Sequence, residues 1–255
     1  MLGTFERANQ MLTLFTLETP DWGITELAEA LGWSTSTTYD IASSLVQTGL
    51  LRKSGKRRYK VGWRVLELSH VLLGSSSLQT EARKQMEEFA SKYDETMLLA
   101  VLAGGKILFA DKIVSQQISP NTFSTPDGRF GAHCTAAGKV IMANLSAEAR
   151  QAVTDEHGLG PMTPKSIQSL ETLNEELERV KAQGHAYDFE EAVVGLGSVA
   201  APIFDYLGIE VAALSIAAPI QQFERRLDSY RSEVVRAARQ VSRRLGHVGV
   251  ATSSN

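Results

Sequence analysis

The chain of 255 residues is poor in the features that mark secreted, membrane or cysteine-rich metal proteins. Its single cysteine, Cys134, allows no intrachain disulfide and no cysteine-rich zinc site. No stretch approaches the roughly 18 consecutive apolar residues of a membrane span. Residues 1–7 lack the basic and then apolar pattern of a signal peptide. We therefore expect a cytoplasmic protein with no membrane partner.

The sequence also lacks common catalytic motifs. It contains no Gly-x-Ser-x-Gly elbow, Walker loop or His-Glu-x-x-His pair, and Gly195-Leu196-Gly197 lacks the third glycine of a dinucleotide-binding loop. His133 precedes Cys134, as a base might precede a thiol nucleophile, but adjacent side chains usually diverge and no orienting acid is nearby. We expect no enzymatic activity and no cofactor; a small-molecule-processing enzyme that uses Cys134 and His133 is the alternative.

The chain has no overall excess of basic residues, since its net charge is -3. The charge is uneven, however. Residues 1–64 hold 8 basic and 6 acidic side chains, against 18 and 23 in the remainder. Seven basic side chains and no acidic one lie between Gly49 and Arg64. A basic segment of this kind is the electrostatic mark of a nucleic-acid site, confined here to one stretch.

Residues 24–62 predict a helix, a tight turn, a second helix and a two-stranded hairpin. The first helix ends at Gly32, the second begins near Ser34, and Gly49 suits the left-handed position past its end. Apolar residues recur at helical spacing in both helices, so the two can pack together. They are Ile24, Leu27, Ala28 and Leu31 in the first helix, and Thr38, Ile41, Ala42 and Leu45 in the second. A further helix is expected over residues 4–17, with a turn at residues 20–23.

The outer face of the second helix carries polar side chains that can reach base edges in a DNA major groove. These are Thr35, Ser36, Thr37, Tyr39, Asp40 and Ser43. The hairpin that follows can bind phosphates through Lys56, Arg57 and Arg58. The pattern predicts a winged helix-turn-helix that binds a double-stranded DNA operator. A helical bundle with a solvated basic loop, or an interaction adaptor on the same fold, remains the alternative.

Residues 63–77 predict a linker helix and a hinge near Gly74. The helix is apolar over more than half of its circumference, so it needs a packing partner. A second copy of the chain would make a homodimer with two DNA-reading heads, and packing on its own chain is the alternative.

The pattern changes after Leu78 to that of a mixed domain. Strands are expected over 96–102, 106–111, 186–190, 198–205 and 210–217, and helices over 79–92, 135–144, 147–156, 166–183 and 223–245. We therefore expect a two-domain α+β protein. Residues 1–62 form the DNA-binding domain, residues 63–77 the linker helix and hinge, and residues 78–255 an effector-binding and oligomerisation domain.

Four further stretches occur in a characteristic order: His133-Cys134-Thr135-Ala136-Ala137-Gly138-Lys139, Tyr187-Asp188-Phe189-Glu190-Glu191, residues 195–205 and residues 211–219. With the winged helix-turn-helix, they make the chain resemble the IclR-type bacterial transcriptional regulators almost from end to end. The resemblance implies a C-terminal effector domain similar to the GAF fold, with an antiparallel sheet, and assembly as dimers or dimers of dimers. It implies a regulator of catabolic genes, a repressor in preference to an activator, that responds to a small organic acid.

The resemblance also implies where the effector binds. The matching residues are Phe130, Ala136, Ala137, Asp188, Leu196, Ser198, Ser215 and Ala217. Free amides at the start of a helix near Ala136 would favour a carboxylate, and the two serines add hydroxyls to an apolar wall. Each residue also has a plainer interpretation: the serines as strand residues bonded to backbone, Asp188 as a capping carboxylate, and Phe130 as core.

Two departures from the family pattern limit what relatives imply about the operator and the effector of this chain. Family members commonly carry a basic residue at the position of Asp40 and a second hydroxyl at the position of Ala217. Asp40 can accept a hydrogen bond from a cytosine amino group, so the operator of a relative cannot be assumed. Ala217 makes the pocket more apolar, and we therefore expect a larger or aromatic carboxylate in preference to a two-carbon acid.

Overall fold

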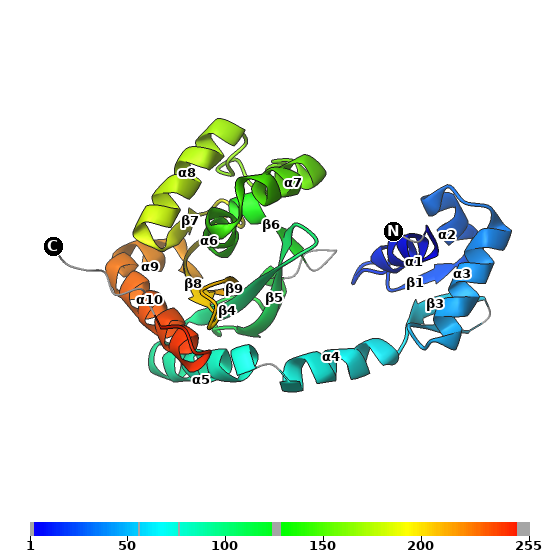
Figure 1. Cartoon of the computed structure of the whole chain (residues 1–255), viewed down its shortest axis with the longest axis horizontal. Coiled ribbons are helices and arrows are strands. Elements are labelled where there is room, and N and C mark those ends of the chain that lie inside the picture. The colour runs from blue at the N-terminus through cyan, green and yellow to red at the C-terminus, as the bar shows by residue number, and fades with distance from the viewer. Residues whose placement is uncertain (1–2, 56, 76, 124–128, 249–255) are drawn as a thin grey trace. The chain divides into compact units, whose positions relative to one another are not determined.

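A computed structural model describes residues 3–55, 57–75, 77–123 and 129–248. They divide into two compact units, with the boundary between Ser75 and Ser77 (Figure 1). Lys56, one of the predicted phosphate-binding residues, lies outside the described residues. No helix within the described ranges is both long enough and apolar enough to cross a membrane.

The first unit is the predicted winged helix-turn-helix followed by the linker helix. Its elements are α1 (Gly3–Thr13), β1 (Asp21–Gly23), α2 (Ile24–Leu31), α3 (Thr35–Gln47), β2 (Leu51–Ser54), β3 (Arg58–Val61) and α4 (Arg64–Ser75). Met11, Leu27 and Ala42 are fully buried in the core that the three N-terminal helices share. Gly32 and Gly49 have φ of 66° and 76°, the left-handed conformation that ends α2 and α3.

Three local expectations for this unit were wrong. Asp21–Gly23, expected as a turn, is a strand that pairs with β3 in a sheet of order β1-β3-β2. The first helix ends at Thr13, four residues early, and the Trp22 indole N–H donates to the Leu14 carbonyl at 2.9 Å. Gly74, expected in the hinge, belongs to α4. The first two depend on contacts between residues far apart in the chain, which local spacing does not reveal.

The linker helix α4 keeps its apolar side chains exposed. Leu66 and Leu68 are 62% and 49% exposed, and Trp63 just before the helix is 69% exposed. These side chains therefore form an exposed apolar surface on the helix.

The second unit is an antiparallel six-stranded sheet of order β6-β5-β4-β9-β8-β7, flanked by helices. Its strands are β4 (Thr96–Ala103), β5 (Lys106–Ile113), β6 (Arg129–Gly131), β7 (Ala186–Phe189), β8 (Leu196–Phe204) and β9 (Glu210–Pro219). Its helices are α5 (Ser77–Tyr93), η1 (Pro120–Phe123), η2 (Ala132–Cys134), α6 (Ala136–Asn144), α7 (Ala147–His157), α8 (Leu170–Gln183), α9 (Ile220–Arg225) and α10 (Leu227–Arg244).

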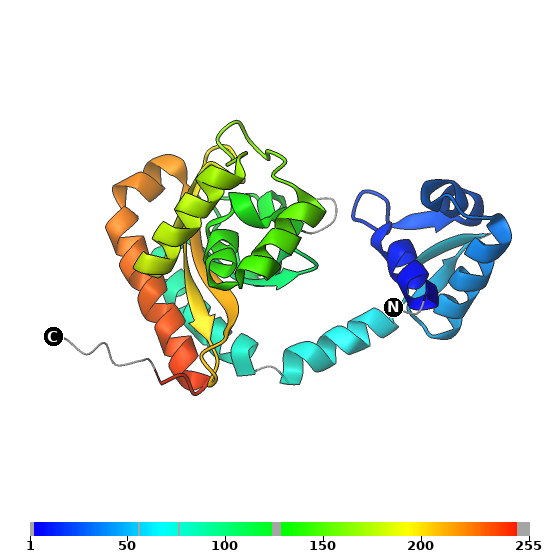
Figure 2. The same cartoon turned by 45° about the horizontal axis from the view of Figure 1, so that its top comes forward.

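Alternation along the strands divides the core into two layers. Met97, Leu99 and Ile216 pack with residues of α5 and α10, whereas Ala200 and Ala213 pack with residues of α6 and α8. Figure 2 shows the helices on the two faces of the sheet. The alanines let α6 lie close to the sheet. The α6 face also holds the candidate effector site.

Other boundaries differ from the expectation. The closing helix, expected over 223–245, is two helices separated at Arg226, whose φ of -116° is not helical. The helix expected from residue 166 begins at Leu170, because the Ser169 hydroxyl caps it by accepting from the Thr172 amide. The short elements β6, η1 and η2 were not expected, since three or four residues carry too little periodicity.

Candidate functional site

The exposed face of α3 is set by its cap and its buried stripe. The Ser34 hydroxyl accepts from the Thr37 amide at 3.2 Å and so fixes the start of the helix. The predicted stripe of Thr38, Ile41, Ala42 and Leu45 is buried. Of the residues predicted to contact bases, Thr35, Ser36, Tyr39 and Asp40 are exposed, and Thr37 and Ser43 are half-buried.

A groove of about 610 Å³ runs between α3, the hairpin and the start of α2. Thr35 and Tyr39 line it from the helix, and Lys53, Arg57 and Arg58 line it from the hairpin. The structure therefore brings predicted base-contacting and phosphate-contacting residues to one concave surface.

Arg58 is held by acidic neighbours within this unit. Its guanidinium donates to Asp21 at 2.7 Å and to Glu26 at 2.9 and 3.1 Å. The hydrogen bond from Arg58 holds the pKa of Glu26 below its usual range. Arg57 is exposed, has a φ of 72°, and makes no ion pair in the described part of the chain. Arg58 thus ties the hairpin to α2, whereas the neighbouring Arg57 makes no ion pair with the residues that the structure describes.

The second candidate site is a small cavity, the effector cavity, on the α6 face of the sheet. Strand register aligns Asp188 with Ser198 and Ser198 with Ala217, so the three lie in one row across β7, β8 and β9. The cavity measures about 30 Å³, and seven of the eight residues predicted to bind the effector line it. These are Phe130, Ala137, Asp188, Leu196, Ser198, Ser215 and Ala217. The eighth, Ala136, is fully buried beside it at the start of α6.

The first turn of α6 offers hydrogen-bond donors next to this cavity. The Thr135 hydroxyl caps the helix by accepting from the Gly138 amide at 2.9 Å. Within the described ranges, the amides of Ala136 and Ala137 donate to no other residue, as is usual for the first amides of a helix. Thr135 and Ala137 line the cavity, so a ligand there would lie at the positive end of the helix dipole.

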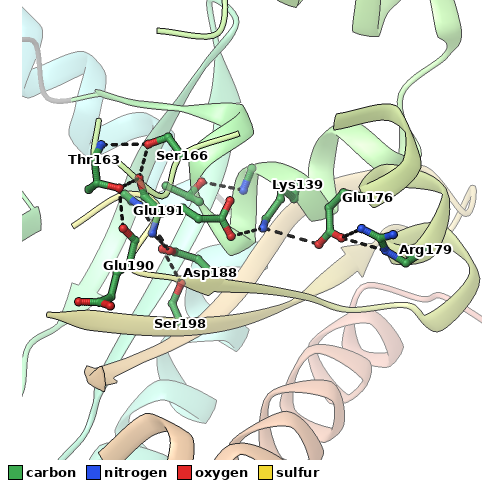
Figure 3. A network of polar contacts seen from close by, with 12 residues as sticks. Lys139, Thr163, Ser166, Glu176, Arg179, Asp188, Glu190, Glu191 and Ser198 are labelled. Atoms are coloured by element: carbon green, nitrogen blue, oxygen red, sulfur yellow. Dashed lines mark hydrogen bonds and ion pairs between the residues drawn. The ribbon is translucent and has the colours of Figure 1, made fainter. Parts of the chain in front are cut away.

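Asp188 is the acidic group of the effector cavity. Its carboxylate accepts from the amides of Glu191 at 2.7 Å and Ala192 at 3.4 Å, and from the Ser198 hydroxyl at 3.2 Å (Figure 3). Burial nevertheless raises the pKa of Asp188 to about 7, because desolvation of the charge outweighs these hydrogen bonds. At neutral pH the cavity therefore contains an acid poised between its charged and neutral forms.

A buried ion-pair network lies directly behind Asp188. The Lys139 ammonium, on α6, is 2.6 Å from Glu191 and 3.6 Å from Glu176 (Figure 3). The Glu191 Oε2 atom is buried without a hydrogen bond to the described residues, and burial raises the pKa of this carboxyl. Glu191 and Glu176 thus pair with the one ammonium of Lys139, which acts on Asp188 only through a weaker Coulombic attraction.

Several lining residues were not predicted from the sequence. They are Leu98, Phe109, Phe123, Thr135, Ala192 and Val193. Phe109 packs against Phe123 and Phe130 with ring centroids 6.0 and 5.3 Å apart, so one wall is aromatic. Alternation along the expected strand 96–102 could have indicated Leu98, which pairs with Ser215. Phe123 lies in a 3-10 turn that leaves no periodic signal.

The His133–Cys134 pair is not arranged for nucleophilic catalysis. Cys134 is fully buried, and burial raises the pKa of its thiol, which disfavours the reactive thiolate. His133 Nε2 lies 3.2 Å from the Gly160 carbonyl instead of at the thiol. Among the residues that the structure describes, no group of three or more His, Cys, Asp or Glu side chains is placed to hold a metal ion.

Comparison with protein families gives two matches that together span most of the chain. The IclR helix-turn-helix domain matches residues 4–55, and the bacterial transcriptional regulator IclR C-terminal domain matches residues 70–243. The HTH-type transcriptional regulator KdgR of Escherichia coli is 31% identical over 227 residues, which cover 88% of this chain and 86% of KdgR. The transcriptional repressor IclR of Escherichia coli is 28% identical over 224 residues, 86% of this chain and 81% of the repressor.

A solved structure supports the same fold. It is that of an IclR homologue from Microbacterium hydrocarbonoxydans complexed with 4-hydroxybenzoate. The match covers 95% of this chain and 98% of the chain of the homologue, with a TM-score of 0.78 at 22% sequence identity.

Proposed function

This chain belongs to the IclR family of bacterial transcriptional regulators, and we propose that it controls catabolic genes by binding a palindromic operator in response to an organic carboxylate. The observation that carries this proposal is the groove in which the polar face of α3 meets the basic hairpin. The exposed face of α3 can enter the major groove of a DNA duplex while the basic hairpin lies against the phosphate backbone. Such a regulator acts in the cytoplasm, where the chromosome lies.

On DNA, we assign base recognition to Thr35, Ser36, Thr37, Tyr39, Asp40 and Ser43, and phosphate binding to Lys56, Arg57 and Arg58. Arg57 is the strongest candidate for a phosphate contact because it is exposed and unpaired within the described chain. Arg58 can reach a phosphate only by sharing its hydrogen bonds to Asp21 and Glu26. Arg58 therefore has a second role, which is to hold the hairpin at the angle at which Arg57 meets DNA.

We place the effector in the cavity beside α6, with its carboxylate at the amides of Ala136 and Ala137. Asp188 and Ser198 would then bind a polar group at the opposite end of the ligand. The cavity of about 30 Å³ has room for roughly a water molecule, so the aromatic side chains must separate when the effector enters. Phe109, Phe123 and Phe130 offer ring faces and edges, which favours an aromatic acid over a two-carbon acid.

The 4-hydroxybenzoate complex of the Microbacterium homologue is consistent with an aromatic acid here. Repression is the favoured mode, because a similar relative is the transcriptional repressor IclR; activation is the alternative. The exposed apolar face of α4 favours a homodimer in which two linker helices pair, and a dimer of dimers would follow if the effector units also associate.

The DNA experiment starts from genome-wide mapping of bound sites, which supplies an operator and names the neighbouring pathway. Dissociation constants for that duplex and a scrambled duplex are then measured by fluorescence anisotropy over a range of salt concentrations. Arg57→Ala is expected to weaken both duplexes alike and to reduce the salt slope by about one per chain. Arg239→Ala, a change at an exposed arginine of α10, is the matched control.

Substitutions at Thr37, Tyr39 or Asp40 are instead expected to change which duplex is preferred. An affinity that does not fall with salt would contradict DNA binding through this surface. For the effector, a thermal-shift panel of acids is expected to show stabilisation by aromatic carboxylates. Stabilisation by glyoxylate or pyruvate alone would overturn that preference.

A further inference from the structure

The effector cavity has an acid in its wall but no basic side chain. Among the described residues, its lining contains no lysine, arginine or histidine, and Asp188 is the charged side chain in it. A carboxylate effector, as placed by the proposed function on which this inference rests, therefore enters a space that already holds an acid. Its charge is attracted by the dipole of α6 and by the amides of Ala136 and Ala137, without help from a cation in the described wall.

The buried ammonium of Lys139 is already engaged by other carboxyl groups. It lies 2.6 Å from Glu191 and 3.6 Å from Glu176 of α8 (Figure 3). Burial is the main cause that raises the pKa of Asp188, and the charge of Glu191, which also raises it, has a larger effect than the charge of Lys139, which lowers it. Lys139 therefore does not offset a second negative charge beside Asp188.

The other titratable neighbours of Asp188 lie on η2 and favour their neutral forms. Burial lowers the pKa of His133 and raises the pKa of the Cys134 thiol. From β4, β5, β8 and β9, the described side chains that line the cavity do not titrate; they are Leu98, Phe109, Leu196, Ser198, Ser215 and Ala217. The charge in the cavity is therefore decided by Asp188 and by whatever ligand binds.

The hydrogen bonds of Asp188 show which of its oxygens can carry a proton. Oδ1 accepts from the amides of Glu191 at 2.7 Å and Ala192 at 3.4 Å, so this oxygen stays an acceptor. Oδ2 meets the Ser198 hydroxyl at 3.2 Å. A hydroxyl can rotate and accept instead of donating. A proton on Oδ2 can therefore be donated to Ser198 or to a ligand, while both amide bonds to Oδ1 remain.

We propose that Asp188 binds the effector as a neutral carboxylic acid, so that an anionic effector enters the cavity together with one proton from solvent. The proton bonds to Oδ2, and the charge of the effector replaces the charge that Asp188 loses. Without this proton, two carboxylates would face each other in a cavity of about 30 Å³, where charges repel more strongly than in water. Asp188 therefore makes effector affinity depend on pH.

The test measures binding of 4-hydroxybenzoate to the full chain by calorimetry at pH 6 and pH 8. The carboxylate of this probe is ionised at both values, since carboxylic acids titrate at about pH 4. Because burial raises the pKa of Asp188 to about 7, about nine tenths of the free protein holds the proton at pH 6 and about one tenth at pH 8. The dissociation constant should therefore rise about tenfold from pH 6 to pH 8. At pH 8, buffers of different ionisation enthalpy should report uptake of about 0.9 proton per bound probe.

Three variants assign the proton to one residue. Asp188→Asn keeps the shape of the side chain and should bind the probe with the same affinity at both pH values, without proton uptake. Glu191→Gln removes the neighbouring buried carboxyl and should still take up a proton. Glu175→Gln, a change at an exposed glutamate of α8, is the matched control and should behave as wild type.

Equal affinity of wild type at both pH values, without proton uptake, would overturn the proposal and leave the effector site standing. Proton uptake that persists in Asp188→Asn, or that is lost in Glu191→Gln, would also overturn it, because another group then carries the proton. If the probe binds wild type at neither pH, the proposed aromatic effector falls and this proposal falls with it. If Asp188→Asn does not fold, as judged by circular dichroism, proton uptake by wild type and by Glu191→Gln decides.

Discussion

Replacing Asp188 with asparagine is expected to raise the free energy of unfolding of the effector unit above that of wild type, and to do so more at pH 8 than at pH 5. Asparagine keeps the shape of aspartate, can accept from the amides of Glu191 and Ala192, and can donate to the Ser198 hydroxyl. The substitution therefore removes the titratable proton at this position and keeps the hydrogen bonds. Burial raises the pKa of Asp188 from 3.8 to about 7, so the folded protein holds this proton more tightly than the unfolded chain.

The sign and size of the effect follow from this pKa. The stability that the bound proton contributes is complete below about pH 4, falls as the pH rises through 7, and is lost at pH 8. At about 1.4 kcal/mol per pH unit over the two units from pH 5 to the pKa of about 7, the wild type loses about 3 kcal/mol by pH 8 that Asp188→Asn does not lose. Glu191, whose pKa burial also raises, is present in both proteins, so its contribution largely cancels in the difference.

The assay is urea unfolding at the two pH values, followed by far-UV circular dichroism. All three tryptophans, Trp22, Trp33 and Trp63, precede α4, so tryptophan fluorescence reports the DNA-binding unit and should be unchanged. Glu175→Gln, a change at an exposed glutamate, is the matched control and should alter stability by less than about 0.5 kcal/mol. If the free energies of unfolding of Asp188→Asn and wild type differ by the same amount at both pH values, Asp188 does not change its protonation between pH 5 and pH 8 as expected.

Three further substitutions test other contacts. Ser34→Ala removes the cap of α3 and is expected to cost about 1 kcal/mol, read by tryptophan fluorescence, with Ser36→Ala having a smaller effect. Lys139→Met leaves Glu191 buried without its ammonium and should cost about 3–5 kcal/mol by circular dichroism, whereas adding Glu191→Leu should recover most of it. Burial raises the pKa of Glu210 to about 9 and outweighs the side chain of Asn144, which acts in the opposite direction. The stability that the proton on Glu210 contributes is lost as the pH rises from about 4.5 through 9. From pH 5 to pH 8, the free energy of unfolding of Glu210→Gln in urea should therefore rise by on the order of 2–4 kcal/mol relative to that of wild type.

Local chemistry made much of the fold predictable. The hydroxyl of Ser34 caps α3, and Gly49 follows the end of that helix with a φ of 76°, as the sequence indicated. These features depend on residues close in the chain. The long helices and strands were predictable for the same reason, because their apolar spacing spans several turns or alternations.

Features that depend on distant partners were not predictable. Arg58 looks like any basic residue of the hairpin, and only the fold brings it to Asp21 and Glu26. The strand β1 is three residues long and exists because β3 pairs with it. In such cases tertiary contacts decide the local structure, and the sequence around them carries no signal.

The candidate effector cavity was partly predictable. Family resemblance named seven of its lining residues, and strand register explains why they meet. The raised pKa of Asp188 was beyond sequence reasoning, because it arises from burial beside Glu191, which itself pairs with Lys139. The aromatic wall was missed in part because Phe123 comes from an irregular segment.

We propose that a carboxylate bound beside α6 changes how tightly the winged units bind DNA. The most direct measurement is the anisotropy of a mapped operator duplex with the full chain, with and without a saturating acid from the thermal-shift panel. We expect the acid to change the dissociation constant at least about fivefold for wild type and less for Ser198→Ala. An operator affinity that is identical with and without the saturating acid would contradict it, since a ligand without differential affinity shifts no equilibrium.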